Sequence, residues 1–395
     1  MTTHNFHEII ERKNTDSLKY DFPLSQTSTK DLLPLWVADM DFQTAPSVIE
    51  TLLEKSRHGI FGYPYPGDDY FNILKAWFSH NFKWNIKEEW LVTTPGVVYA
   101  ICSAIRALTN QGDSVLIQQP VYHPFSSSIL LNQRRQIINQ LVYQKQKYFL
   151  DFADFTDKII KNRVKLFILC NPHNPVGRVW TKDELMQLGE ICLKHNVLVI
   201  ADEIHADFIY PGYQHQVFSQ LKQEFGAITI TCTSPSKTFN LAGLQISNIF
   251  IENSDIRDKF RKELAKNGYH QPNNMGIAAC KAAYSGGQKW LEELMNYLTE
   301  NLNFVRSFLE KNLPRIKLVE PQGTYLIWLD FSALGLSDDQ LDELITKKAG
   351  LFLNSGKMFG VGGSGFQRLN IACPRAVLKK ALQNLAQAIL ENPAN

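Results

Sequence analysis

The chain has 395 residues, of which 44% are hydrophobic, and its 41 Lys and Arg against 39 Asp and Glu give a formal net charge of +2 at pH 7. This length predicts two domains, and a balanced charge without a basic run argues against nucleic acid or an anionic membrane as a partner. Because no apolar run approaches the roughly 18 residues that span a bilayer, and the N-terminus does not resemble a secretory signal, we expect a cytoplasmic protein.

The first part of the chain, to about residue 45, shows no periodic pattern, whereas its middle alternates short apolar runs with helical segments. Strands are predicted at 115–117, 164–170, 197–201 and 228–232. A helix is predicted to begin at Thr181 and to extend to about Lys194. Strands that are apolar throughout and separated by helices are typical of an α/β fold, with a mostly parallel sheet covered on both faces. Ligand-binding groups are then expected where the strands end.

From about Gly287 the pattern changes to a smaller α+β arrangement. It comprises a long helix at 290–312, a strand at 323–329, a short helix at 338–348, a Gly-rich stretch at 359–365, a strand at 366–372 and a final helix. We therefore expect a large domain over residues 46–286. The small domain would be built from both chain ends, residues 1–45 and 287–395.

The six cysteines are far apart and include no C-x-x-C pair. They are Cys102, Cys170, Cys192, Cys232, Cys280 and Cys373. This spacing suits neither a metal site nor a disulfide framework, so we expect small buried side chains in a reducing compartment and no bound metal.

Two serines closely precede Lys237 just after the strand predicted at 228–232, in the order Ser234-Pro235-Ser236-Lys237. Two hydroxyls beside an ammonium can bind a phosphate, and a desolvated lysine deprotonates readily and forms an imine with an aldehyde. The same residues would also suit a solvated loop, so the interpretation depends on what accompanies them.

Three further groups accompany these residues, and two of them come directly after predicted strands. Asp202 ends an apolar strand, where an unpaired carboxylate is costly; a cationic pyridine ring would be a fitting partner, and a helix cap is the alternative. Asn174 lies in a loop constrained by two prolines, where its amide can donate to a phenolate oxygen. Gly96 and Val97 begin a helical pattern whose backbone N–H groups can hold a phosphate.

With these motifs in this order, the chain resembles the fold-type-I enzymes that depend on pyridoxal 5′-phosphate (PLP), the aspartate aminotransferase superfamily. It is most similar there to the bacterial cystathionine β-lyase or C–S lyase group. The resemblance extends over nearly the whole chain. It is carried by residues 36–42, 58–63, 94–98, 120–122, 171–175, 202–207, 234–243, 323–326 and 366–370. It implies the aspartate aminotransferase-like fold, PLP as the cofactor and a homodimer.

The resemblance also implies a role for each matched residue. Lys237 would bond the cofactor aldehyde and then act as the base at the substrate Cα. Asp202 would pair with the pyridine nitrogen and Asn174 would contact the 3-oxygen. Tyr122 would stack on the ring, although a tyrosine there also suits the core.

For the phosphate and the substrate the resemblance implies two further groups. The phosphate would be held by Gly96, Val97, Ser234, Ser236 and, from the neighbouring subunit, Tyr63. The α-carboxylate of the substrate would be gripped by Arg368 as a two-pronged donor, with Val37 and Ala38 lying alongside the substrate.

Two positions depart from the aminotransferases of the superfamily. Gln245 stands where an arginine usually binds the phosphate, and His205 stands where a tyrosine usually donates to the 3-oxygen. Both changes are typical of the C–S lyase group. They leave open how the second phosphate charge is neutralised and whether His205 contacts the cofactor or only packs.

The reaction implied is α,β-elimination of L-cystathionine or a related cysteine S-conjugate, which releases pyruvate, ammonia and a thiol. An aminotransferase of class I/II on the same fold is the alternative. A second, less favoured alternative is a regulatory protein that uses the fold only for binding, although no added DNA-binding segment supports it. The preferred thioether and the proton donor to the leaving thiolate stay open.

Overall fold

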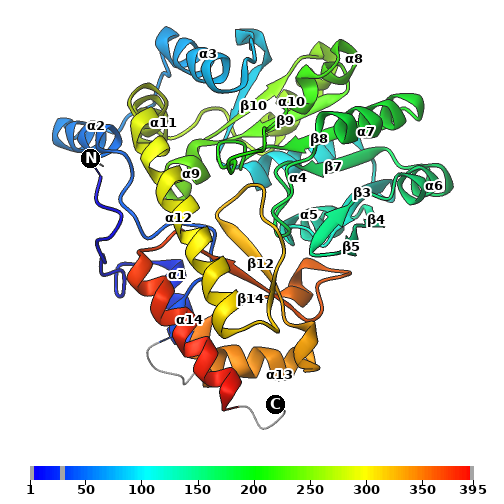
Figure 1. Cartoon of the computed structure of the whole chain (residues 1–395). Helices are drawn as coiled ribbons and strands as arrows, with labels where there is room; N and C mark the ends of the chain where they lie inside the picture. Colours follow the sequence, from blue (N-terminus) through cyan, green and yellow to red (C-terminus); the bar gives the residue numbers. More distant parts are fainter. Residues whose placement is uncertain (1–3, 27–31, 392–395) are drawn as a thin grey trace.

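The computed structural model describes residues 4–26 and 32–391, and its centre is a seven-stranded sheet (Figure 1). In spatial order the strands are β2 (Leu91–Thr94), β10 (Ser247–Ile251), β9 (Thr229–Thr233), β8 (Leu198–Asp202), β7 (Leu166–Cys170), β3 (Ser114–Gln119) and β4 (Arg135–Gln140). β10 runs antiparallel to its neighbours β2 and β9, and the other adjacent pairs are parallel. The predicted α/β fold with a mostly parallel sheet is confirmed. Residues 1–3, 27–31 and 392–395, all within the predicted small domain, lie outside the described residues.

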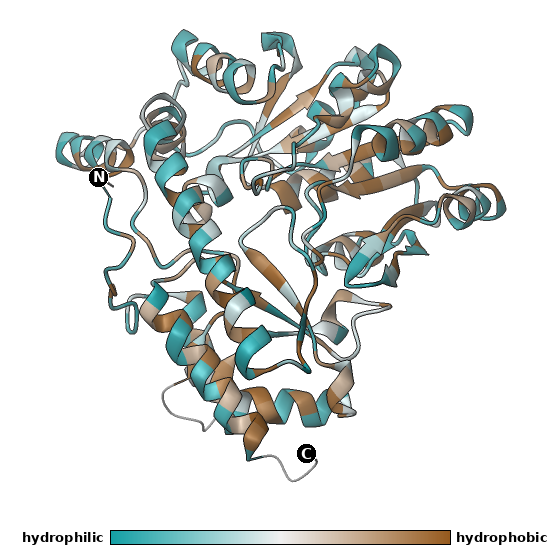
Figure 2. Cartoon of the chain, viewed as in Figure 1, coloured by the Kyte–Doolittle hydropathy of each residue, from teal (hydrophilic) through white to brown (hydrophobic). Residues whose placement is uncertain are grey.

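Helices cover both faces of this sheet. One face carries α4 (Val97–Leu108), α5 (Pro124–Leu131) and α10 (Ser254–Lys266), and the other carries α6 (Phe152–Asn162), α7 (Lys182–Lys194) and α8 (Gln223–Gly226). The predicted start of α7 is confirmed, because Thr181 and Glu184 cap it reciprocally. Figure 2 shows hydrophobic strands between helices whose outer sides are hydrophilic. Among the helices of the described residues, none is long and apolar enough to cross a bilayer.

Side-chain alternation along the central strands decides which groups reach each face. In β8, Ile200 packs toward α4 and α10, whereas Val199 and Ala201 pack toward α6 and α7. Asp202, two residues after Ile200, points to the same face as Ile200. Cys170 at the end of β7 pairs with Asp202 in register. The two strands therefore end with Cys170 and Asp202 on the face that holds the N-terminus of α4.

The remaining elements come from the two ends of the chain and the stretches that join them. The N-terminal elements are α1 (Leu18–Gln26), β1 (Leu33–Pro34), α2 (Pro46–His58) and α3 (Asp68–Phe82), and α11 (Asn274–Gly286) packs on α2 and α3. The C-terminal elements are α12 (Gln288–Asn312), β11 (Lys317–Leu318), β12 (Leu326–Asp330), α13 (Asp338–Glu343), β13 (Leu351–Phe352), β14 (Asn354–Ser355), β15 (Phe366–Asn370) and α14 (Arg375–Leu390). A hairpin of β5 (Val142–Gln144) and β6 (Lys147–Phe149) and the single turn α9 (Pro235–Thr238) complete the fold.

Four C-terminal elements differ from their predicted bounds. The long helix expected over 290–312 begins at Gln288, and the strand expected over 366–372 ends at Asn370. The strand expected from Gly323 begins only at Leu326, because Gly323 bridges to Ile209 and the Thr324 N–H bonds to the Phe208 carbonyl instead. The helix expected over 338–348 is α-helical to Glu343 and then continues as a wider π-helical turn over Leu344–Lys348.

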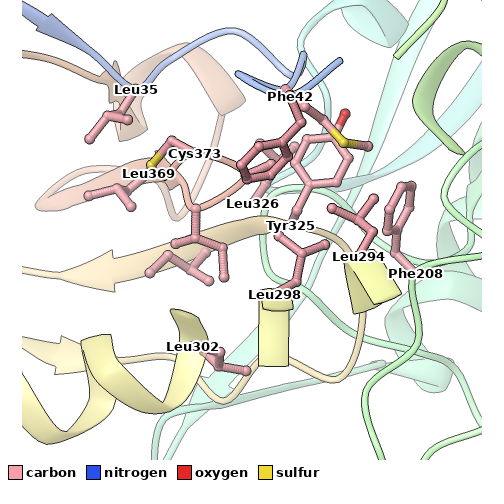
Figure 3. Packing of buried hydrophobic residues seen from close by; sticks show 14 of the residues in the cluster. Leu35, Phe42, Phe208, Leu294, Leu298, Leu302, Tyr325, Leu326, Leu369 and Cys373 are labelled. Carbon is pink, nitrogen blue, oxygen red and sulfur yellow. The ribbon is translucent and has the colours of Figure 1, made fainter. Parts of the chain in front are cut away.

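The N-terminal stretch joins the C-terminal elements by backbone pairing and by a shared apolar core. β1 pairs in parallel with β13, and the Asn370 N–H bonds to the Leu35 carbonyl at 2.9 Å. Figure 3 shows how α12 side chains, Leu294 among them, meet Phe42 and Tyr325 in one buried cluster. The domain boundaries, 46–286 against 1–45 with 287–395, stay a prediction.

Close packing of α7 on α8 generates a test of the fold. A Cβ added at Gly189 would lie 2.1 Å from Cζ of Phe225, whose fully buried ring stacks on Phe218 with centroids 5.1 Å apart. We expect Gly189→Ala to lower the free energy of unfolding by about 1–3 kcal/mol through overpacking, measured by urea denaturation. Gly243→Ala is the control, because a Cβ there meets no atom within 4 Å. An equal effect of both substitutions would contradict the packing argument.

Candidate active site

Lys237 lies in the single turn α9, directly after β9. Its Nζ donates to the carbonyl of Ala38 at 2.6 Å, so two segments almost 200 residues apart meet at this amine. Burial lowers the pKa of Lys237 to about 8; the negative charge of Asp39 opposes this and the positive charge of Arg368 adds to it. The amine is thus able to give up its proton near neutral pH.

Asp202 is buried at the end of β8, as the alternation of that strand requires. Burial raises the pKa of its carboxyl group to about 7, against the opposing effects of the Ile204 N–H, which donates to it at 3.2 Å, and of Lys237. Within 4.0 Å of this carboxylate, the described residues offer no cationic partner. A buried acid in this state favours a cationic ligand, which would restore its charge.

Asn174 and Tyr122 are held together by the loop that follows β7. The Tyr122 N–H donates to the Asn174 carbonyl at 2.9 Å. The Asn174 Oδ1 accepts a hydrogen bond from Nη1 of Arg368 at 2.9 Å. With its oxygen engaged, the amide of Asn174 offers its Nδ2 as a donor.

Arg368 in β15 is a buried cation surrounded by neutral acceptors. Its Nη2 donates to the Trp36 carbonyl at 2.8 Å and to Oδ1 of Asn354 at 2.5 Å, and the guanidinium lies 5.0 Å from the centroid of the Phe359 ring. Its Nε is buried without a hydrogen-bond partner among the described residues. Burial lowers the pKa of Arg368 to about 10, and the group keeps its charge.

A cavity of about 430 Å³ joins most of the predicted residues. Its walls include Ala38, Gly96, Val97, Tyr122, Asn174, Asp202, His205, Ser236 and Lys237. Val37, Ser234, Arg368 and Tyr63 do not line it. The Val37 carbonyl accepts from Asn370 at 2.7 Å, and Arg368 reaches the cavity wall through Asn174.

One end of the cavity is rich in donors without a fixed charge. α4 begins at Val97 with Gly96 as its N-cap, so its first N–H groups are free of intrahelical partners. Ser236 lines the same cavity, and its Oγ is 2.6 Å from the Oγ of Ser234, which donates to the Ile246 carbonyl and caps α9. Gln245 lines this end in a left-handed conformation with φ of 49°.

His205 lines the cavity with a buried ring. Its Nδ1 has no hydrogen-bond partner in the described chain, and the ring packs edge-on to Tyr325 with centroids 5.9 Å apart. Burial, with the positive charges of Lys237 and Arg368, lowers the pKa of His205 to about 3. The imidazole is therefore neutral at physiological pH and presents an unsatisfied nitrogen beside the cavity.

Tyr63 lies apart from this cavity within its own chain. Its side chain is 95% exposed, in the loop between α2 and α3, together with the exposed Phe61 and Tyr65. Within one chain, Tyr63 therefore does not contribute to the cavity that holds Lys237 and Asp202.

The sequence assigns no role to several residues of the site. Asn354 and the Trp36 carbonyl fix Arg368, and the Tyr325 hydroxyl donates to the Ala38 carbonyl at 2.9 Å. The other residues of the cavity wall are Pro95, Val98, Tyr99, Cys170, Ile204, Ala242 and Gln245. Pro95, Val98, Ile204 and Ala242 lie in stretches that carry the family resemblance, but the sequence assigns no role to any of them. Tyr99 and Cys170 lie outside those stretches.

Comparison with known proteins agrees with this geometry. The family model for aminotransferase class I and II matches residues 30–385. The chain belongs to this family. A cystathionine beta-lyase of Bacillus subtilis (strain 168) is 42% identical over 98% of this chain and 100% of its own length.

Two solved structures are similar over nearly their full lengths. Cystalysin from Treponema denticola, which contains PLP, has a TM-score of 0.96 and 38% identity, covering 98% of this chain and 99% of its own. The PLP-bound C–S lyase from Staphylococcus hominis has a TM-score of 0.92 and 32% identity, covering 99% of both chains.

The buried carboxyl group of Asp202 generates a stability test. Between about pH 4 and pH 7 the native state holds a proton that the unfolded state has released, so this group makes the cofactor-free protein less stable as pH rises. We expect Asp202→Asn, without cofactor, to gain about 2–4 kcal/mol over the wild type at pH 8 and much less at pH 4. Urea denaturation at both pH values measures this. A gain that is the same at both pH values would contradict the assigned shift.

Proposed function

We propose that this protein is a PLP-dependent C–S lyase that carries out α,β-elimination on L-cystathionine or a related cysteine S-conjugate, giving pyruvate, ammonia and a thiol. The observation that carries the proposal is the meeting of Lys237, Asp202 and Asn174 in one cavity, in a chain similar from end to end to C–S lyases. An enzyme of this class takes a small amino acid as its substrate.

The donor set of the cavity fits PLP. Asp202, buried and without a cation, suits the ring nitrogen, and the free Nδ2 of Asn174 suits the 3-oxygen. The N–H groups of Gly96 and Val97 and the hydroxyl of Ser236 suit the phosphate, with Ser234 holding Ser236 in place. Tyr122 would lie against the ring. Bound there, PLP would act as an electron sink for the bonds at the substrate Cα.

The chain's own residues would then handle protons and hold the substrate. Arg368 would bind the α-carboxylate, because its charge is unpaired and its Nε is unsatisfied, with Val37 and Ala38 alongside. Lys237, with its pKa lowered to about 8, would bond the cofactor and afterwards remove the Cα proton. The departing thiolate would receive a proton from Lys237 or from a tyrosine of the pocket.

His205 would act as a neutral neighbour of the cofactor. A buried imidazole with an unsatisfied Nδ1 can exchange a hydrogen bond with the ring substituents without adding charge. A tyrosine in this position would instead supply a hydroxyl donor. This difference, together with Gln245, distinguishes the site from those of the wider superfamily.

An assay without any 2-oxoacid separates the lyase from a class I/II aminotransferase. We expect purified enzyme incubated with L-cystathionine alone to release pyruvate and thiol in equal amounts over many turnovers. Turnover that appears only when 2-oxoglutarate is added would overturn the lyase. Lys237→Ala is expected to lose both elimination and the visible absorbance of the bound cofactor, since both depend on the same amine.

We also propose a homodimer in which Tyr63 of one subunit reaches the phosphate of the other. Within the described residues, the cavity wall carries no cation besides Lys237, so a dianionic phosphate needs donors from elsewhere. Exposed apolar and aromatic residues surround Tyr63, namely Ile60, Phe61 and Tyr65. Large exposed side chains gathered in one loop are typical of an interface.

Mixed dimers test this arrangement. Tyr63→Phe should weaken PLP binding about tenfold through the loss of one charge-assisted hydrogen bond, measured by cofactor titration of the apoenzyme. In a mixed dimer with Lys237→Ala, the one site that keeps Lys237 would receive an intact Tyr63 from the other subunit. We expect that site to regain wild-type PLP affinity. A mixed dimer whose surviving site binds PLP as weakly as the Tyr63→Phe homodimer would place Tyr63 in its own subunit's site.

Two further assignments belong to this proposal. We infer a large domain over 46–286 and a small one from 1–45 and 287–395, supported by the pairing of β1 with β13. We infer the cytoplasm as the compartment, supported by six free cysteines, five of them buried. Thiols that form no disulfide are typical of a reducing environment.

A further inference from the structure

The segment from Trp36 to Phe42 joins the substrate arginine to the cofactor lysine through its backbone. The Trp36 carbonyl accepts from Arg368 at 2.8 Å, and the Ala38 carbonyl accepts from Lys237 at 2.6 Å. Asn370, two residues after Arg368, donates to the carbonyls on either side of Ala38 at 2.7 and 2.6 Å. The segment therefore fixes the Ala38 carbonyl in hydrogen-bond contact with Nζ of Lys237.

The other end of the segment is fixed to the lysine loop. Asn240, three residues after Lys237, accepts from the Met40 N–H at 2.9 Å and donates to the carbonyls of Met40 and Phe42 at 2.9 and 3.2 Å. The backbone around Ala38 is thus held by two asparagine side chains, Asn370 at Val37 and Asp39, and Asn240 at Met40 and Phe42.

Two carboxylates leave the same segment away from the cavity, into a four-charge ion cluster. Arg12 donates to Asp39 at 2.8 Å and to Asp41 at 2.7 Å. Lys19, whose side chain is fully buried, lies 2.9 Å from Asp41 and 3.5 Å from Asp39. The cluster is neutral overall, and each cation bridges both carboxylates, so it fixes the backbone between them.

We propose that Asp39 is a positioning residue for Lys237: clamped by Arg12 and Lys19, it fixes the Ala38 carbonyl as the acceptor for the free lysine amine and supplies the negative charge behind that carbonyl. The proposal rests on the proposed function, in which the amine must be free while it moves a proton. Asp39 touches neither substrate nor cofactor in this role.

The charges around Lys237 single out Asp39 within the cluster. Groups of the site that face the amine from the surrounding elements are Asp39, Asp202, His205, Tyr325 and Arg368. Asp39 raises the pKa of Lys237, opposing burial and Arg368 and acting with Asp202. Asp41 is held by the same cations but lies two residues further along the chain, with its N–H on the Ala372 carbonyl. It is therefore a matched control for the loss of one carboxylate from the cluster.

The test compares Asp39→Asn with Asp41→Asn in the holoenzyme. The readouts are the acidic midpoint of the kcat profile for elimination and the pH midpoint of the visible absorbance of the bound cofactor. For Asp39→Asn we expect both midpoints to move to lower pH by about half a unit or more, because a negative charge that favours the protonated nitrogen is lost. For Asp41→Asn we expect both to stay in place. Both substitutions should lower the thermal midpoint, since each breaks the cluster.

Arg12→Gln gives a second test of opposite sign. It removes a positive charge from the cluster and leaves Asp39 less neutralised, so we expect a smaller shift of both midpoints to higher pH.

Equal shifts in Asp39→Asn and Asp41→Asn, or no shift in Asp39→Asn, would overturn the proposal. If Asp39→Asn does not fold, a folded Arg12→Gln with unmoved midpoints overturns it as well. A wild type that binds PLP but eliminates nothing would defeat the proposed function alone, because the absorbance titration still tests Asp39.

Discussion

The structure depends on the burial of charges that have no partner of opposite sign within the chain. Asp202 and Lys237 line one cavity, Arg368 reaches its wall through Asn174, and none of the three forms an ion pair among the described residues. Burial moves the pKa of each toward neutrality, to about 7 for Asp202, about 8 for Lys237 and about 10 for Arg368. Such groups cost stability until a ligand of complementary charge arrives, so the fold gives up stability here in exchange for binding.

The sheet explains how these groups come together. Parallel strands end at a common edge, and the alternation of side chains turns Cys170 and Asp202 toward the N-terminus of α4. A negatively charged ligand group at that helix end and a positive one at Asp202 would lie in the same cavity. A single flat molecule with an anionic arm and a basic ring nitrogen satisfies both, which is a narrow chemical class.

Local sequence predicts the parts of the site that follow from local rules. The apolar runs before Asp202 and Lys237 identify buried strands, and the capping residues of α7 identify its start. Contacts between distant segments follow no such rule. Nothing about Asn354 indicates that it holds Arg368, and Ser234, expected to bind phosphate, directs its hydroxyl to the Ile246 carbonyl. Tyr63, also expected to bind phosphate, is 95% exposed and does not line the cavity.

The segment 36–42 illustrates this limit and its physical reason. It has neither helical nor strand periodicity, because its carbonyls serve side chains of the site instead of a regular ladder. Neutral acceptors orient Arg368 and Lys237 without neutralising them. A carboxylate in direct contact would instead neutralise the positive charge that is needed to bind the ligand. The carboxylates of Asp39 and Asp41 accordingly do not line the cavity, and the positive charges of Arg12 and Lys19 neutralise them. The site is thereby kept rigid while its own charges stay available.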